Sequence, residues 1–243
     1  MIIFFMYTES QTTILNEVSF FGKPENMEKI VNVKILPAQV DTGIIFRRVD
    51  FKENNEITVN YDNTFIENDK LVIKNKNGVC VNNIELLLAS IWALKIDNVI
   101  IELDGDSLPF IDGTSESLLF LLAIANKKEL DKKRKIFILE QEIGARLNDH
   151  EINVKPSQSF SISVQDNAYN SFTYNAIYLP YKDWLSKVAI YSDDKNKIKA
   201  DIVSCIAIIF ISNAFSLFEV DIKNFDKKMA FNFFKNLFDS QNK

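Results

Sequence analysis

The sequence predicts an α+β fold built from two similar halves. Hydrophobic residues form 47% of the 243-residue chain and charged residues 25%, which is typical of a globular protein with a sizeable buried core. In each half, segments rich in Val, Ile and Phe come first, and segments with a helical spacing of apolar residues come later. This order indicates two α+β layers that pack against one another.

Strands are predicted where β-branched and aromatic residues cluster in the first half. The apolar opening, residues 1–7, lacks the basic flank and the length of an export signal, so it is interpreted as an edge strand. The other strand candidates are residues 28–36, 43–51 and 98–103. The Asp41-Thr-Gly43 segment is typical of a tight turn, because glycine tolerates backbone angles that other residues avoid.

The first predicted helix starts at Ile84. Its apolar residues recur at helical spacing, namely Ile84, Leu87, Leu88, Ile91 and Leu94. Asn82 and Glu85 have the spacing of a capping box, in which two side chains satisfy free backbone N–H groups at a helix start. The sequence therefore offers a structural role for Glu85 as part of a helix cap.

A second helix over residues 115–126 follows the turn-forming segment 109–114. The basic run 127–135 is interrupted by Glu129 and Asp131, which favours a solvated linker. The later segments are predicted as strands at 135–143, 160–165 and 218–222, and as helices at 182–188, 197–215 and 227–238.

Composition and charge argue against several classes of function. The net charge of -5 and the pI near 5.1 provide no basic surface for a nucleic acid. The apolar run 202–210 is about half of the ~18 residues that span a membrane, so a buried helix is expected there. Cys80 and Cys205 form no CxxC pair, which fits a reducing cytoplasm and predicts neither a disulfide framework nor a sulfur-rich zinc site. No Walker or GxGxxG nucleotide loop is present.

Several segments occur in an order that resembles one enzyme family. They are Leu36-Pro-Ala-Gln-Val-Asp-Thr-Gly-Ile-Ile-Phe-Arg-Arg-Val-Asp50, Ile84-Glu-Leu-Leu-Leu-Ala89, Lys95-Ile-Asp-Asn-Val99 and Leu108-Pro-Phe-Ile-Asp-Gly-Thr114. Together they resemble the bacterial UDP-3-O-acyl-N-acetylglucosamine deacetylases across most of residues 11–125. Because independent motifs agree, the chain is identified as a divergent and shortened member of this family.

The resemblance implies two consecutive β-α-α-β sandwich domains that pack through their helices, here with a shortened second domain. The domains are expected at residues 1–131 and 132–243. The resemblance also implies a zinc-activated water that hydrolyses the acetamide of an acylated UDP-sugar in the lipid A biosynthesis of a Gram-negative bacterium. A cytoplasmic protein without a transmembrane segment is expected.

The histidines that bind zinc in the family are missing from the matching positions. The family's Glu-His pair corresponds to Glu85 and Leu86, so the general-base position is kept and a zinc ligand is lost. The family's His-x-x-x-Asp helix corresponds to residues 197–201, where Asp201 fills the one retained ligand position and Lys197 replaces a histidine. An ammonium group repels a dication instead of binding it.

Other functional positions differ as well. Phe20 replaces the histidine of an early family loop, and the region 227–235, which matches the family's C-terminal acid, contains no histidine. His150, the only histidine of the chain, lies in a polar segment predicted as a solvated turn. An insert that shapes the family's acyl-chain passage is missing after residues 184–191.

These differences predict a catalytically inactive relative that uses no zinc or other cofactor and has a binding or regulatory role. Its expected ligand is an acylated UDP-sugar or a protein partner. The alternative is a hydrolase with weak or rebuilt activity centred on Glu85 and Asp201. One form of it would be a metal site of Asp201 and Cys205 with Cys80 or His150. A third possibility is a decaying gene product that still folds, because a fold does not by itself define a function.

Overall fold

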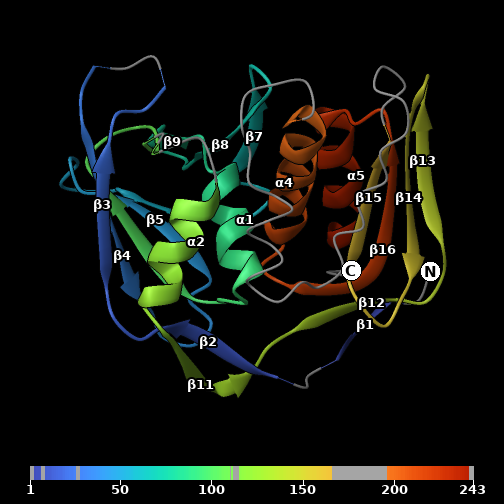
Figure 1. Ribbon diagram of the computed structural model, residues 1–243, viewed down its shortest axis with the longest axis horizontal. Coiled ribbons are helices and arrows are strands. Elements are labelled where there is room, and N and C mark those ends of the chain that lie inside the picture. The colour runs from blue at the N-terminus through green and yellow to red at the C-terminus, as the bar shows by residue number, and fades with distance from the viewer. Residues whose placement is uncertain are drawn as a thin grey trace.

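Two β-sheets with helices between them make up most of the described chain (Figure 1). The computed structural model describes residues 3–6, 9–25, 28–109, 111, 115–165 and 196–240. The described helices are α1 (Glu85–Ala93), α2 (Ser115–Ile124), α4 (Asn196–Phe210) and α5 (Lys227–Asp239). The predicted α+β fold class is confirmed, whereas the division into domains after residue 131 stays a prediction.

The first sheet has the strand order β3-β4-β10-β5-β6. Its strands are β3 (Val18–Gly22), β4 (Val31–Pro37), β5 (Ile44–Arg48), β6 (Glu56–Thr58) and β10 (Val99–Leu103). β10 pairs antiparallel with β4 and parallel with β5, so the three strands predicted in this half lie side by side. A smaller antiparallel sheet contains β7 (Thr64–Glu67), β8 (Lys70–Lys74) and β9 (Cys80–Asn82). These three short strands were not predicted from the sequence.

The second sheet has the order β1-β12-β16-β14-β13, with β15 also paired to β16. Its strands are β1 (Ile3–Met6), β12 (Ile136–Leu139), β13 (Ile143–Leu147), β14 (His150–Pro156), β15 (Ser161–Gln165) and β16 (Phe215–Lys223). β1 lies at one end of this order, which confirms the predicted edge strand, and β13 lies at the other. The predicted helix 182–188 lies outside the described residues.

The helix predicted over 197–215 is shorter in the structure, because α4 ends at Phe210. The chain then turns at Asn213, whose backbone φ is 53°, in the left-handed region that ends helices. Phe215 therefore begins β16 instead of ending the helix. Residues 202–210 are buried, which confirms the predicted buried helix. In the described part of the chain, no helix combines the length and apolar character that crossing a membrane requires.

The prediction that the basic run 127–135 is a linker is wrong. Residues Lys127–Lys133 form β11, which pairs antiparallel with β2 (Ser10–Ile14), and Lys127 faces Ile14 in the register. The run is nevertheless mostly exposed, as expected for lysine-rich sequence. The run forms a strand because it pairs with β2, which lies more than a hundred residues earlier. The local sequence of the run therefore does not indicate a strand.

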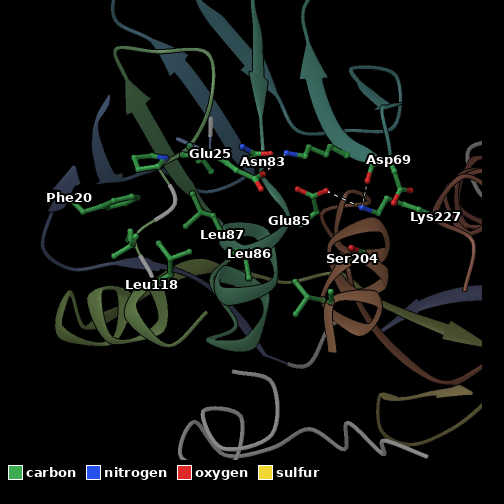
Figure 2. A pocket seen from close by; sticks show the side chains of 16 residues that line it. Phe20, Glu25, Asp69, Asn83, Glu85, Leu86, Leu87, Leu118, Ser204 and Lys227 are labelled. Carbon is green, nitrogen blue, oxygen red and sulfur yellow. Dashed lines mark hydrogen bonds and ion pairs between the residues drawn. The ribbon is translucent and has the colours of Figure 1, made fainter. Parts of the chain in front are cut away.

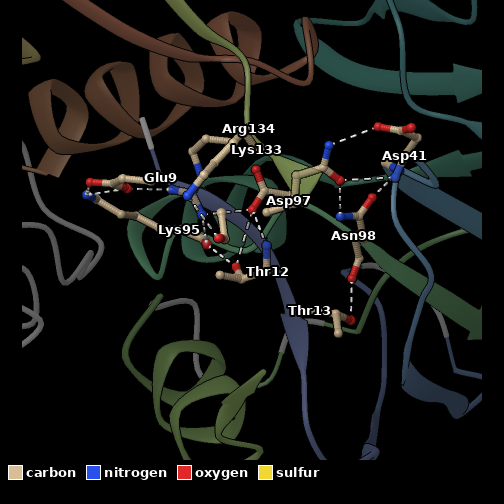
Figure 3. A network of polar contacts seen from close by, with 12 residues as sticks. Glu9, Thr12, Thr13, Asp41, Lys95, Asp97, Asn98, Lys133 and Arg134 are labelled. Carbon is tan, nitrogen blue, oxygen red and sulfur yellow. Dashed lines mark hydrogen bonds and ion pairs between the residues drawn. The ribbon is translucent and has the colours of Figure 1, made fainter. Parts of the chain in front are cut away.

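The buried side chain of Arg134 contacts several segments of the chain near the connection of the two halves (Figure 3). The Arg134 side chain is 2% exposed, and its Nη2 donates to the Asp97 carboxylate at 2.8 Å and to the Lys95 carbonyl at 3.0 Å. Its Nη1 lies 3.2 Å from a Glu9 carboxylate oxygen, and the guanidinium lies 4.5 Å from the centre of the Phe215 ring. Burial raises the pKa of Asp97, and the nearby Arg134 charge partly offsets that shift.

Helix α1 packs against both α4 and α2, and it is buried around most of its circumference. Its buried residues are Leu87, Leu88, Ala89, Ser90, Ile91 and Trp92, a wider surface than the single predicted stripe. The Tyr61 hydroxyl donates to the Ile208 carbonyl of α4 at 2.7 Å, which links the loop after β6 to the helix layer. This packing of α1 on α4 places the start of α1 next to the second half of the chain.

Candidate functional site

A cavity of about 320 Å³ lies beside the start of α1, between α4, α5 and the turn before β8 (Figure 2). Its apolar lining consists of Phe20, Leu86, Leu87, Leu108, Pro109, Ile111, Leu118, Ala200 and Val203. Its polar lining consists of Glu25, Asp69, Lys70, Asn83, Glu85, Ser204 and Lys227. The cavity is therefore apolar over much of its wall, with charged groups gathered near Glu85.

Glu85 is held by two partners at the polar end of the cavity. Its Oε1 accepts a hydrogen bond from the Leu71 backbone N–H at 2.8 Å and lies 3.4 Å from the Lys227 Nζ. Lys227 also donates to the Asp69 backbone carbonyl (Figure 2). The Lys227 and Glu85 side chains are only 13% and 15% exposed, so the ammonium and the carboxylate neutralise one another in a partly desolvated place.

The predicted capping box at this helix start is wrong. The residue before the helix, Ile84, makes no side-chain capping bond, and the Asn82 amide donates instead to the Asp106 carbonyl at 2.7 Å. The Glu85 carboxylate instead accepts a hydrogen bond from the Leu71 backbone N–H of β8. Glu85 still lies in the first turn of α1, where the positive end of the helix dipole stabilises a carboxylate.

Helix α4 presents Ala200, Val203 and Ser204 to the cavity. Ala200 and Ser204 are four residues apart and therefore share one helix face. The predicted ligand Asp201 is half-buried on the same helix and is not among the described residues that line the cavity. The side chain of Lys197 falls outside the described part of the structure.

The side chains near Glu85 do not fit a catalytic zinc ion. Such an ion takes three protein ligands from His, Cys, Asp or Glu and keeps one position for water. The neighbours Leu86 and Ala200 are hydrocarbon side chains, and Ser204 offers an alcohol in place of a carboxylate. Across all described residues, no three His, Cys, Asp or Glu side chains are grouped closely enough to hold a metal ion.

The hypothetical metal site of Asp201 and Cys205 with Cys80 or His150 is not formed. No three of these described residues are close enough together to bind one metal ion. Cys205 is fully buried in α4, where burial, and next the charge of Asp201, raise the pKa of its thiol well above its usual range. His150 was predicted as a solvated turn residue. It is instead the first residue of β14, and its imidazole ring is held by a contact of 2.6 Å between Nδ1 and the Asn224 carbonyl oxygen.

Sequence reasoning singled out several residues of this cavity and missed its cation. Glu85, Leu86 and Phe20, all singled out by their positions in the family motifs, line the cavity. Lys227 was expected as the first residue of a helix and of the region 227–235, which matches the family's C-terminal acid. The helix start has a local signal, since the Asp226 carboxylate accepts the Met229 N–H at 2.6 Å, but nothing in the local sequence shows that Lys227 reaches Glu85.

The fold and the cavity define an α+β protein with a site enclosed by helices of both halves. Residues 11–181 match the family described as UDP-3-O-acyl N-acetylglycosamine deacetylase. This match extends over more than half of the chain, and the chain belongs to that family. The family membership predicted from the motifs is confirmed.

Curated relatives agree with this assignment. The chain is 33% identical over 156 residues to the UDP-3-O-acyl-N-acetylglucosamine deacetylase of Ruthia magnifica subsp. Calyptogena magnifica, which covers 64% of the chain and 50% of the relative. The protein of the same description from Wigglesworthia glossinidia brevipalpis is 31% identical over 155 residues, 63% of the chain and 51% of the relative. The chain thus spans about half the length of the curated relatives it matches.

Proposed function

We propose that this chain is a non-hydrolysing member of the deacetylase family that acts in lipid A biosynthesis as a binding or regulatory protein. The observation that carries the proposal is the pairing of Glu85 with Lys227 and the Leu71 N–H, in a cavity whose other nearby side chains do not fit zinc. The cytoplasmic location expected from the sequence belongs to the same proposal.

Amide hydrolysis at neutral pH needs a strongly activated water. A bound zinc ion lowers the pKa of water from 15.7 to about 7, and at about 1.4 kcal/mol per unit this is worth about 12 kcal/mol. A carboxylate alone supplies general-base assistance of about 10²–10⁴-fold, or about 3–5 kcal/mol. Glu85 offers less than that, because its Oε1 already accepts a backbone hydrogen bond and faces an ammonium.

The cavity supports ligand binding better than catalysis. Apolar side chains such as Phe20, Leu86 and Leu118 form much of its wall and suit the acyl group of the acylated UDP-sugar that the relatives' names describe. We therefore propose that the chain binds this UDP-sugar through its acyl group and leaves the acetamide intact.

Calorimetric titration with a UDP-3-O-acyl-N-acetylglucosamine, followed by measurement of released acetate, tests the proposal. Binding without acetate release is expected, and Phe20→Ala should weaken binding by about tenfold through lost apolar contact. The neighbouring Phe21→Ala is the matched control, because Phe21 is 70% exposed and is not one of the residues lining this cavity.

Two results contradict the proposal in different ways. Acetate release that disappears in Glu85→Gln would support the alternative hydrolase centred on Glu85 and Asp201. The absence of both binding and acetate release would indicate that the chain folds but does not bind this ligand.

A further inference from the structure

A second hollow, of about 880 Å³, lies between the last strand of the second sheet and α5. Its apolar walls are Ile143, Ala145 and Leu147 of β13 and Met229, Phe233 and Leu237 of α5, and we name it the α5 groove. Figure 1 shows β13 at the outer edge of the second sheet, and α5 on the helix side of that sheet. The α5 groove shares no described lining residue with the cavity at Glu85.

The walls of the α5 groove are two regular apolar rows. Ile143, Ala145 and Leu147 alternate along β13, so their side chains share one face of the strand. Met229, Phe233 and Leu237 are spaced by four residues, so they form a stripe along α5. The rows do not close on one another, and Leu147 is left 58% exposed.

The rim of the α5 groove carries positive charge. Arg146 and Lys228 line it and are both exposed, and neither forms an ion pair with any residue that the structure describes. Asp226 contributes one carboxylate to the lining, and this carboxylate accepts the Met229 N–H at 2.6 Å as the cap of α5. Two exposed cations and one carboxylate therefore line the open apolar groove, whereas the chain as a whole has a net charge of -5.

We infer that the α5 groove docks an acidic amphipathic helix of a partner protein. The apolar stripe from Met229 to Leu237 is about 12 Å long at about 1.5 Å per residue, which matches partner residues at i, i+3, i+4 and i+7. Carboxylates beside that partner stripe would meet Arg146 and Lys228. The inference is independent of the proposed ligand of the Glu85 cavity.

Two synthetic helical peptides of about four turns provide the probe. Both carry leucine at the i, i+3, i+4 and i+7 positions; one has glutamate and the other lysine at its remaining polar positions. Fluorescence anisotropy with the whole chain should show the acidic peptide binding at least about tenfold more tightly, with an affinity that falls as salt rises.

Variants of the groove decide where the acidic peptide binds. The pair Arg146→Glu and Lys228→Glu should weaken binding by at least about tenfold. The pair Lys52→Glu and Lys76→Glu makes the same change of charge at exposed residues of the other half and should leave binding unchanged. Leu147→Asp, at a 58% exposed residue, should abolish binding without unfolding the protein, which a urea midpoint checks.

Equal affinity for the two peptides, no binding of the acidic peptide, or equal effects of the two charge-reversed pairs would each overturn the inference. Sodium laurate provides a further arm. Laurate binding that is lost in Leu147→Asp, together with no binding of the acidic peptide, would assign the groove to an anionic lipid and not to a helix.

Discussion

Replacing Lys227 with methionine removes the positive charge from the cavity and keeps an unbranched apolar side chain. The Glu85 carboxylate would then retain only the Leu71 N–H as a described hydrogen-bond partner. Breaking a fully buried ion pair by removing one partner costs about 3–5 kcal/mol, and an exposed pair contributes about 0–1 kcal/mol. With side chains 13% and 15% exposed and 3.4 Å between nitrogen and oxygen, we expect Lys227→Met to lower the free energy of unfolding by about 1.5–3 kcal/mol.

Urea unfolding at neutral pH measures this loss, and a double-mutant cycle with Glu85→Gln isolates the pair. The glutamine oxygen can still accept the Leu71 N–H, so the cycle should report a coupling of about 1–2 kcal/mol between Lys227 and Glu85. Lys223→Met is the control, because Lys223 is exposed and has no ion pair with a described residue. A loss no larger than that of the control, or an additive cycle, would refute the assigned role of Lys227.

Two further predictions concern groups outside the cavity. Arg134→Met should lower the free energy of unfolding by about 2–4 kcal/mol at pH 7, because it leaves the Asp97 carboxylate, 12% exposed, without its guanidinium. The raised pKa of Asp97 makes a stabilising contribution that is complete below the unfolded pKa near 3.8 and is lost as the pH rises through the folded pKa. The loss in Arg134→Met should therefore shrink between pH 7 and pH 4 in urea titrations, and a loss that grows would contradict this linkage. Cys205 is fully buried and its thiol pKa is raised, so it should react with a maleimide only after denaturation. Half-buried Cys80 should react in the native protein. Modification of both cysteines at equal rates would contradict the packing of α4.

Much of the fold could be predicted because its signals are local. β4, β5, β10, α1 and α5 all lie within or close to the predicted ranges, since their apolar spacing directly reflects the face that each element buries. β11 could not be predicted in this way, because a lysine-rich segment becomes a strand only through pairing with the distant β2. Pairing between segments far apart in the chain is a tertiary effect that local spacing does not record.

The candidate site likewise contains residues that a local motif identifies and residues that only the folded chain brings together. Glu85 and Leu86 were found because they belong to a motif within a single helix start, and they do line the cavity. The second half of the site depends on which face of α4 is directed to the cavity, and the residues of α4 that line it are Ala200, Val203 and Ser204. Lys227 reaches Glu85 from a residue 142 positions later, so that contact required the folded chain.

Elemental analysis of zinc in protein purified without chelators tests the central claim most directly. The claim is that the cavity beside Glu85 holds the Lys227 ammonium and no catalytic metal ion. A zinc-to-protein ratio near zero, unchanged after dialysis against zinc and removal of the excess, is the predicted result. A ratio near one that falls in Glu85→Gln would contradict the claim and restore metal-assisted hydrolysis as the function of the site.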